Sequence, residues 1–218
     1  MKTVVVFSGG LDSTVLLYDL LQAGDDLLAL SIDYGQRHRV ELDHAEQIAK
    51  TLNVEWQVAD LSGITHLIAG SSQTDDGIAV PHGHYAEESM KQTVVPNRNM
   101  IMLAVAAGWA INRQADRIAY GAHGGDHAIY PDCRPPFAAA MQNALQLADW
   151  HRVDLYAPYI NWKKEEIVQR GVELNVDFSL TWSCYEGGAV HCGKCGTCTE
   201  RQEAFALASV ADPTLYRS

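Results

Sequence analysis

Apolar strands alternate with amphipathic helices from Thr3 to Gly171, and this alternation limits the fold more than any other feature of the chain. A helix between two strands indicates a crossover, which joins parallel neighbours of one sheet. Strands are expected at Thr3–Ser8, Leu27–Asp33, Glu55–Asp60, Arg117–Tyr120 and Asp154–Tyr156, and helices at Asp12–Ala23, Val40–Leu52, Asn97–Arg113, Pro136–Asp149 and Lys163–Gly171. The pattern predicts a doubly wound α/β fold with a mainly parallel, five-stranded sheet.

Two segments depart from the alternation. The polar stretch Ser62–Gln92 contains several Gly and Pro residues, lacks sustained periodicity and is long for a connection, so we expect a functional loop or lid, with partial disorder as the alternative. From about Asp177 the cysteines begin, and a last helix is expected at Thr199–Ala208. The chain is therefore predicted to comprise a main α/β domain, residues 1–176, and a C-terminal segment, residues 177–218.

The charge balance bears on the partners of the chain. Its 16 Lys and Arg residues stand against 27 Asp and Glu residues, which gives a net charge of -11. Proteins that hold nucleic acid usually gather basic residues into a footprint, so a nucleic-acid substrate is disfavoured. We see no apolar run of membrane-spanning length and no signal peptide in Met1–Phe7, and we therefore expect a cytoplasmic protein without a membrane partner.

The turn after the first strand has the features of an anion-binding loop. Gly9 and Gly10 let the backbone approach an anion, and the free N–H groups and dipole of the following helix attract negative charge. Ser8, Ser13 and Thr14 add hydroxyl donors. No Lys follows the glycines as in a Walker A loop, and the third glycine of a dinucleotide fingerprint is missing.

The simpler alternative is a tight turn in which Asp12 or Ser13 only caps the helix. The complete string SGGLDST, however, resembles the pyrophosphate loop of enzymes that use ATP to adenylate an oxygen. This resemblance implies catalytic roles for Ser8, Asp12 and Ser13. It also implies that the following residues bind ATP: Phe7, Ser8, Gly9, Gly10, Leu11, Asp12, Ser13, Thr14, Val15, Leu16 and Leu17.

Four of the five cysteines form a compact pattern, Cys184-x7-Cys192-x2-Cys195-x2-Cys198. Four thiolates around one ion match a closed structural zinc site, and intervening glycines permit the tight turns. Iron–sulfur ligation and redox CxxC chemistry are the alternatives, because thiolates serve both. His191 adjoins a ligand and is a substitute, although a neighbouring His is more often a surface residue.

Taken together, these motifs resemble one family, the 7-cyano-7-deazaguanine synthases. The matching segments are FSGGLDSTVLL (Phe7–Leu17), DYGQRH (Asp33–His38), VPNRN (Val95–Asn99), GAHGGDHAIYPDCRPPF (Gly121–Phe137), and TWSCY with HCGKCGTCTER (Thr181–Arg201). They span nearly the whole chain, and YPDCRP joined to the cysteine spacing is much more specific than the loop alone. Only the middle, Ser62–Gln92, shows little beyond general similarity.

The resemblance implies a Rossmann-like, adenine nucleotide alpha-hydrolase-like fold with a C-terminal zinc appendage. It implies a carbon–nitrogen ligase that converts 7-carboxy-7-deazaguanine, ammonia and ATP into 7-cyano-7-deazaguanine (preQ0), a precursor of the modified tRNA base queuosine. A single site would activate first the carboxylate and then an amide. Mg²⁺ on the phosphates, Zn²⁺ on the cysteines and a homodimer are expected.

Further site residues follow from motif positions. Lys164 resembles the Lys of a K-x-E-I segment that contacts phosphates in pyrophosphate-loop enzymes, with a solvated helix face as the alternative. Asp132 and Arg134 suit the deazapurine edge and its carboxylate, because Asp accepts ring N–H groups and Arg binds carboxylates in a fork. Arg98 is a candidate second cation for the substrate. For these three, a surface turn or a helix surface is the alternative.

Other polar residues carry no specific role at this stage. His123, Asp126 and His127 follow a buried strand, where the sites of α/β proteins gather. Cys133 is read as an inert buried thiol.

Two other functions remain open. One is a tRNA-thiolating or tRNA-amidating ATPase with the same loop, which the acidic charge disfavours. The other is a non-enzymatic zinc-knuckle protein, which SGGLDST disfavours.

Overall fold

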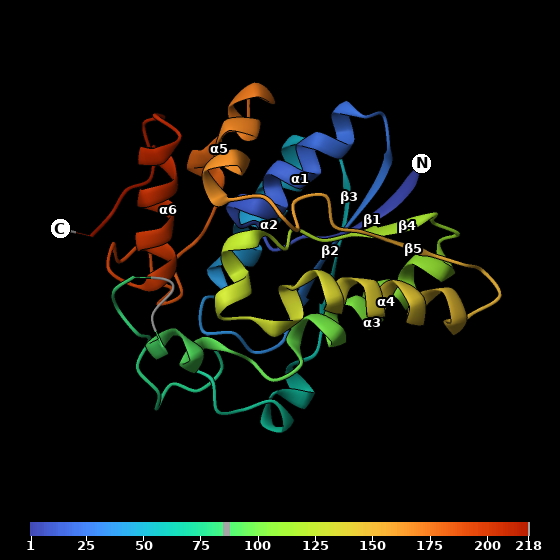
Figure 1. Ribbon diagram of the computed structural model, residues 1–218, viewed down its shortest axis with the longest axis horizontal. Coiled ribbons are helices and arrows are strands. Elements are labelled where there is room, and N and C mark those ends of the chain that lie inside the picture. Colours follow the sequence, from blue (N-terminus) through green and yellow to red (C-terminus); the bar gives the residue numbers. More distant parts are fainter. Residues whose placement is uncertain (85–87, 218) are drawn as a thin grey trace.

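A computed structural model gives the structure of the chain and describes residues 1–84 and 88–217. Five parallel strands form one sheet in the order β3-β2-β1-β4-β5 (Figure 1). The strands are β1 (Lys2–Val6), β2 (Asp26–Asp33), β3 (Glu55–Asp60), β4 (Arg117–Ala119) and β5 (Asp154–Tyr156). The predicted five-stranded parallel sheet is thus confirmed.

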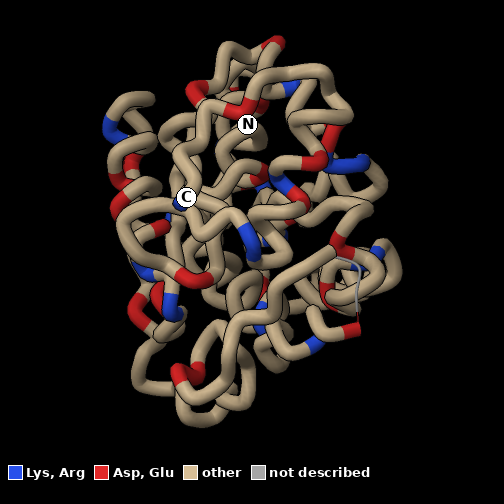
Figure 2. The backbone as a smooth tube through the Cα atoms, turned by 90° about the vertical axis from the view of Figure 1, so that its left-hand side faces the viewer, with Lys and Arg blue, Asp and Glu red and all other residues tan. Residues whose placement is uncertain are grey.

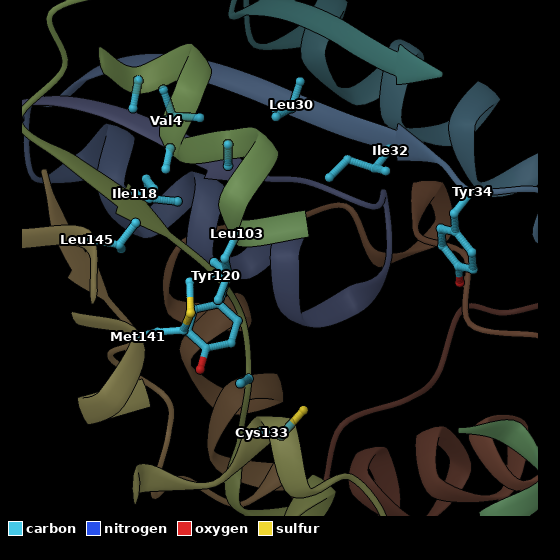
Figure 3. Close-up of a cluster of buried hydrophobic side chains, with 14 of the residues drawn as sticks. Val4, Leu30, Ile32, Tyr34, Leu103, Ile118, Tyr120, Cys133, Met141 and Leu145 are labelled. Carbon is cyan, nitrogen blue, oxygen red and sulfur yellow. The ribbon is translucent and has the colours of Figure 1, made fainter. Parts of the chain in front are cut away.

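Helices cover both faces of this sheet. They are α1 (Leu11–Gln22), α2 (Val40–Thr51), α3 (Arg98–Asn112), α4 (Pro135–Ala148), α5 (Lys164–Glu173) and α6 (Gly196–Leu207). Adjacent strand residues point to opposite faces. Val4 therefore packs with α3 and α4, in the buried cluster of Figure 3, whereas Val5 packs with α1, α2, α5 and α6. The strand order reverses beside β1, where ligands of open α/β sheets bind.

The long middle segment packs into the molecule. It contains two 3-10 helices, η1 (Ser62–Leu67) and η2 (Glu88–Thr93), and Ser71, Ser72 and Gln73 between them are fully buried. The part of the expected lid at residues 85–87 lies outside the described residues. Gln73 donates from Nε2 to the Thr93 carbonyl at 2.7 Å, so this segment supports its neighbours instead of standing away from them as a lid.

One stretch, Glu88–Asn112, has the length and composition of a membrane-spanning helix, contrary to the expectation from the sequence. Such a match is weak grounds for a span, because core helices of globular proteins pass the same test. Here the stretch is not one helix: η2 ends at Thr93 and α3 begins at Arg98. The 15 residues of α3 are fewer than the roughly 20 that a span needs.

The C-terminal segment shares the core of the main body. Ala204 and Phe205 of α6 pack in the cluster that contains α1 and α5. The Arg201 side chain is fully buried, donates to the Phe178 carbonyl at 3.0 Å and pairs with Asp212 at 3.2 Å, so its charge is compensated. The division at residue 176 stays a prediction. In the described part of the chain, Lys and Arg are scattered among the acidic residues (Figure 2).

Candidate active site

A cavity of about 220 Å³ opens at the carboxyl ends of the strands. Its walls come from the loop after β1, the segments after β2 and β4, the first turns of α2, α3 and α5, and the C-terminal segment. Parallel strands direct their carboxyl ends to one edge, so residues far apart in sequence meet there.

The loop after β1 leaves the N-terminus of α1 open to an anion. Gly10 is the N-cap residue and no side chain caps the helix, so the alternative in which Asp12 or Ser13 acts as the cap is wrong. Gly9 has φ +78, and a Cβ there would lie 2.7 Å from the Glu41 carbonyl oxygen and the Ala45 nitrogen of α2. Glycine is therefore required by both conformation and close packing.

The loop hydroxyls are arranged around the open helix end. Ser8 Oγ accepts from the Gly10 N–H at 3.2 Å and lies 3.1 Å from Ser13 Oγ. Of the expected ATP-binding residues, Phe7, Ser8, Gly10, Leu11, Asp12 and Ser13 line the cavity, whereas Gly9, Thr14, Val15, Leu16 and Leu17 lie behind its wall. Val15, Leu16 and Leu17 pack in the core beneath the loop, and Thr14 Oγ1 is buried with no hydrogen-bond partner among the described residues.

Lys164 reaches this loop from the first turn of α5. Its Nζ lies 2.6 Å from Asp12 Oδ2 and 3.3 Å from Glu200 Oε2. Burial lowers the pKa of Lys164, but the carboxylates of Asp12, Glu200 and Asp126 outweigh burial and raise it. Lys164 is therefore a buried cation in the cavity, and its alternative as part of a solvated helix face is excluded.

His123 and Glu200 complete this charged cluster. His123 Nδ1 accepts from the Gly125 N–H at 3.1 Å, and its Nε2 lies 3.3 Å from Lys164 Nζ and 3.6 Å from Asp126 Oδ2. The pKa of Glu200 is raised, because the effect of burial exceeds the opposite effect of the Lys164 charge. Sequence reasoning assigns no role to Glu200, and its place in the motif HCGKCGTCTER is the one signal that marks it.

The other compartment of the cavity is aromatic and holds one guanidinium. Arg98 donates to Gln73 Oε1 at 3.0 Å, and its guanidinium carbon lies 5.5 Å from the centre of the Tyr130 ring. Tyr34 and Tyr185 also line this compartment. The fork of Arg98 is thus held beside rings that suit a planar heterocycle.

The structure places Asp132 and Arg134 outside the cavity lining. Asp132 Oδ2 accepts from the Asn99 N–H at 3.0 Å in the first turn of α3, and the exposed Arg134 donates from Nε to the His127 carbonyl at 2.7 Å. Cys133 between them does line the cavity (labelled in Figure 3), and burial raises the pKa of its thiol.

The other four cysteines form a buried cluster. The sulfur atoms of Cys184, Cys192, Cys195 and Cys198 lie within 4.8 Å of one another. Four thiolates around one tetrahedral zinc ion, with Zn–S of about 2.3 Å, would be about 3.8 Å apart, and Cys192 and Cys198 are separated by 3.9 Å. The donor set thus fits a single metal ion. An iron–sulfur cluster would interpose several ions and hold the thiolates farther apart. His191 is not in this group, because its Nε2 accepts from the Ser183 N–H at 3.0 Å.

The cysteine cluster is joined to the cavity by backbone and helix. Trp182 lies two residues before Cys184, and its backbone N–H donates to the Gly9 carbonyl at 3.0 Å. Cys195 is the N-cap residue of α6, which carries Glu200 into the cavity. The metal-binding segment therefore builds one wall of the site.

Two solved structures share the fold. A U34-tRNA thiolase from Methanococcus maripaludis aligns with a TM-score of 0.55, 16% identity, and coverage of 96% of this chain and 65% of that one. A predicted subunit of a tRNA methyltransferase from Methanocaldococcus jannaschii aligns with a TM-score of 0.51, 17% identity, and coverage of 79% and 75%. At this identity the likeness concerns the fold alone.

The sequence relatives are much closer. The chain is 52% identical to a 7-cyano-7-deazaguanine synthase of Hahella chejuensis, over 100% of this chain and 94% of that protein. Proteins of the same name from Caldicellulosiruptor bescii and Sinorhizobium fredii are 51% and 55% identical, over 99% of this chain and 97% and 92% of theirs. The family model for "Queuosine biosynthesis protein QueC" matches residues 2–209. The chain belongs to this QueC family.

Proposed function

We propose that this chain is a cytoplasmic, ATP-dependent 7-cyano-7-deazaguanine synthase. The observation that carries the proposal is the arrangement of one cavity: an uncapped helix N-terminus with the Asp12–Lys164 pair lies at one end, and an aromatic compartment with Arg98 at the other. The first end suits the phosphates of ATP and the second a planar, anionic heterocycle.

The first activation converts a carboxylate oxygen into a leaving group. A carboxylate oxygen of 7-carboxy-7-deazaguanine attacks the α-phosphorus of ATP, the bond to the bridging oxygen breaks, and pyrophosphate leaves. Ammonia then attacks the acyl carbon and loses a proton, and AMP departs with the electrons of the C–O bond. The product is the amide.

The second activation repeats the chemistry on the amide oxygen. This oxygen attacks the α-phosphorus of a second ATP, and pyrophosphate again leaves. Loss of two N–H protons and of AMP then forms the nitrile. Asp126 and Glu200 lie beside the loop as carboxylates able to accept protons.

The loop residues stabilise charge that develops on the phosphates. Backbone N–H groups of the α1 N-terminus with Ser8 and Ser13 donate hydrogen bonds, and the Lys164 ammonium is the cation that meets pyrophosphate. Mg²⁺, when bound, neutralises phosphate charge, and Asp12 is suited to hold it because its buried Oδ1 lacks a hydrogen-bond partner among the described residues.

The cysteine cluster holds zinc in this proposal. The mutual proximity of the four sulfurs supports one tetrahedral ion, and no thiol of the cluster is left over for sulfur transfer. The ion would stabilise the wall formed by Trp182 and Glu200, without contact to the substrate.

We also infer a homodimer. The outer faces of α3 and α4 carry apolar side chains, with Met100 42% and Leu147 87% exposed, and the following Trp150 is fully exposed. A second copy of the chain would cover them. Light scattering should give twice the chain mass of 23.9 kDa.

The central test is product formation. Purified protein incubated with 7-carboxy-7-deazaguanine, ammonium and ATP labelled at the α-phosphate should give the nitrile by mass spectrometry, with two labelled AMP per nitrile. Supplying the amide should give the nitrile with one AMP and no need for ammonium. Absence of nitrile from both substrates, with folded and metal-loaded protein, would refute the proposed function.

A further inference from the structure

A buried carboxylate faces the aromatic compartment from the first turn of α2. Glu41 lines the cavity with its side chain 13% exposed, and its Oε1 accepts from Gln36 Nε2 at 2.9 Å. Gln36 is itself fixed, because its amide also donates to the Ile32 carbonyl and accepts from the Tyr34 N–H. The orientation of the Glu41 carboxylate is therefore set before any ligand arrives.

This carboxylate has unused capacity for hydrogen bonds. Two carboxylate oxygens accept about four hydrogen bonds, whereas His38 Nε2, the nearest basic nitrogen to Oε2, lies 3.6 Å away. The Nδ1 of His38, a residue 3% exposed, has no hydrogen-bond partner among the described residues. The wall thus offers acceptors and a buried imidazole that await donors from a ligand.

The pKa shifts of Glu41 and His38 are consistent with a carboxylate that lacks hydrogen-bond donors. The pKa of Glu41 is raised to about 7, because the effect of burial exceeds the opposite effects of the Gln36 hydrogen bond and the Arg98 charge. Burial also lowers the pKa of His38 to about 3, so the imidazole is neutral and does not compensate the carboxylate. A ligand with N–H groups directed at Glu41 would favour its charged form.

The compartment combines an acceptor and a cation within one aromatic enclosure. Arg98 lies near enough to Glu41 to lower its pKa, and both residues line the same cavity with Tyr34 and Tyr185. A complementary ligand is a flat ring with paired N–H donors on one edge and a negative group on another. 7-Carboxy-7-deazaguanine has this pattern, with N1–H and the 2-amino group on one edge.

We propose that Glu41 is the specificity-determining residue for the base, accepting hydrogen bonds from N1–H and the 2-amino group, with Gln36 as the residue that positions it. This inference rests on the proposed function and deepens it. A site built to pair a substrate N–H leaves a buried acceptor unsatisfied when that group is missing, and it therefore rejects the analogue strongly.

The competing assignment for the same carboxylate is the ribose of ATP, because acidic residues near the end of the second strand bind ribose hydroxyls in some α/β folds. The two assignments differ in which KM a substitution changes. They are separated by varying the base and the nucleotide independently.

The experiment compares wild type with Glu41→Gln on two substrates, 7-carboxy-7-deazaguanine and its analogue without the 2-amino group. Wild type should prefer the former on the order of 10³-fold in kcat/KM. In Glu41→Gln this preference should fall below about tenfold, through loss on the guanine-type substrate, while the KM for ATP stays within about twofold of wild type. Asp43→Asn is the control, because it removes the same charge from an exposed position two residues further along α2. This variant should behave as wild type.

Other outcomes overturn the inference. A raised KM for ATP with the preference retained would assign Glu41 to the nucleotide, and an unchanged Glu41→Gln would make the carboxylate a bystander. If Glu41→Gln does not fold, as judged by circular dichroism, Glu41→Asp keeps the charge and must retain part of the preference. Wild type that makes no nitrile would refute the proposed function instead. Calorimetric binding of the two bases to the wild-type and Glu41→Gln proteins would then still test the inference: it stands only if the preference falls in the variant.

Discussion

At the scale of single residues, the Lys164 ammonium is the group whose removal should most affect the chemistry. Lys164→Gln should lower kcat on the order of 10²–10³-fold, because a preorganised cation on the phosphates is lost. Steady-state kinetics with circular dichroism as a fold check measure this. Lys163→Gln, the same substitution at an adjacent side chain that is 77% exposed, is the matched control. Similar kinetics for the two variants would remove Lys164 from the mechanism.

Two arginines compete for the substrate carboxylate. Arg98 lines the cavity, whereas Arg134 is exposed and bonded to a backbone carbonyl. Arg98→Met should therefore lower kcat/KM for the carboxylate substrate at least about tenfold more than for the amide, since a guanidinium pairs more strongly with an ionised group. Arg134→Met should affect both substrates equally. The reverse result would assign the carboxylate to Arg134.

At the scale of elements, the contact between the loop and α2 depends on Gly9. Gly9→Ala should lower both the thermal midpoint and kcat, because the φ of +78 is strained for alanine and the Cβ would meet α2 backbone at 2.7 Å. Gly24 is the control: its φ is +81, yet a Cβ there meets nothing within 4 Å. Gly24→Ala therefore measures the cost of conformation alone, about 1 kcal/mol. If the two substitutions lower the thermal midpoint equally, α2 shifts to accommodate the added methyl group without loss of stability.

The elements also show what the sequence can predict. The anion-binding loop after β1 and the four-cysteine site can be predicted from the sequence, because the residues of each are close in sequence and each site requires specific residue types. Glu41, His123 and Glu200 were not assigned, because their roles depend on three segments meeting at one edge of the sheet. Asp132 belonged to a recognisable motif, but its partner is the start of α3, which only packing reveals.

At the scale of the whole molecule, the four-cysteine cluster lies in the C-terminal segment, which contacts the site through Trp182 and α6. We expect one zinc per chain and a colourless protein. Chelation or Cys195→Ser should lower the thermal midpoint and abolish activity, since structural zinc contributes on the order of 10 kcal/mol in small modules. Metal analysis and calorimetric melting measure this. Cys133→Ser, which leaves the four-sulfur cluster intact, should retain the zinc. A brown, iron-containing protein would contradict the zinc assignment, and normal stability of Cys195→Ser would contradict the structural role.

The sequence positions of Glu200 and Trp182 determine when the site can form during translation. The loop at Ser8–Ser13 is translated well before Trp182 and Glu200, which form another part of the cavity wall. A nascent chain that has exposed only its sheet therefore lacks the Glu200 carboxylate near Lys164 and the Trp182 amide on the Gly9 carbonyl. We therefore expect the site to be complete only after residue 200 has left the exit tunnel, and chains truncated before residue 182 to be inactive.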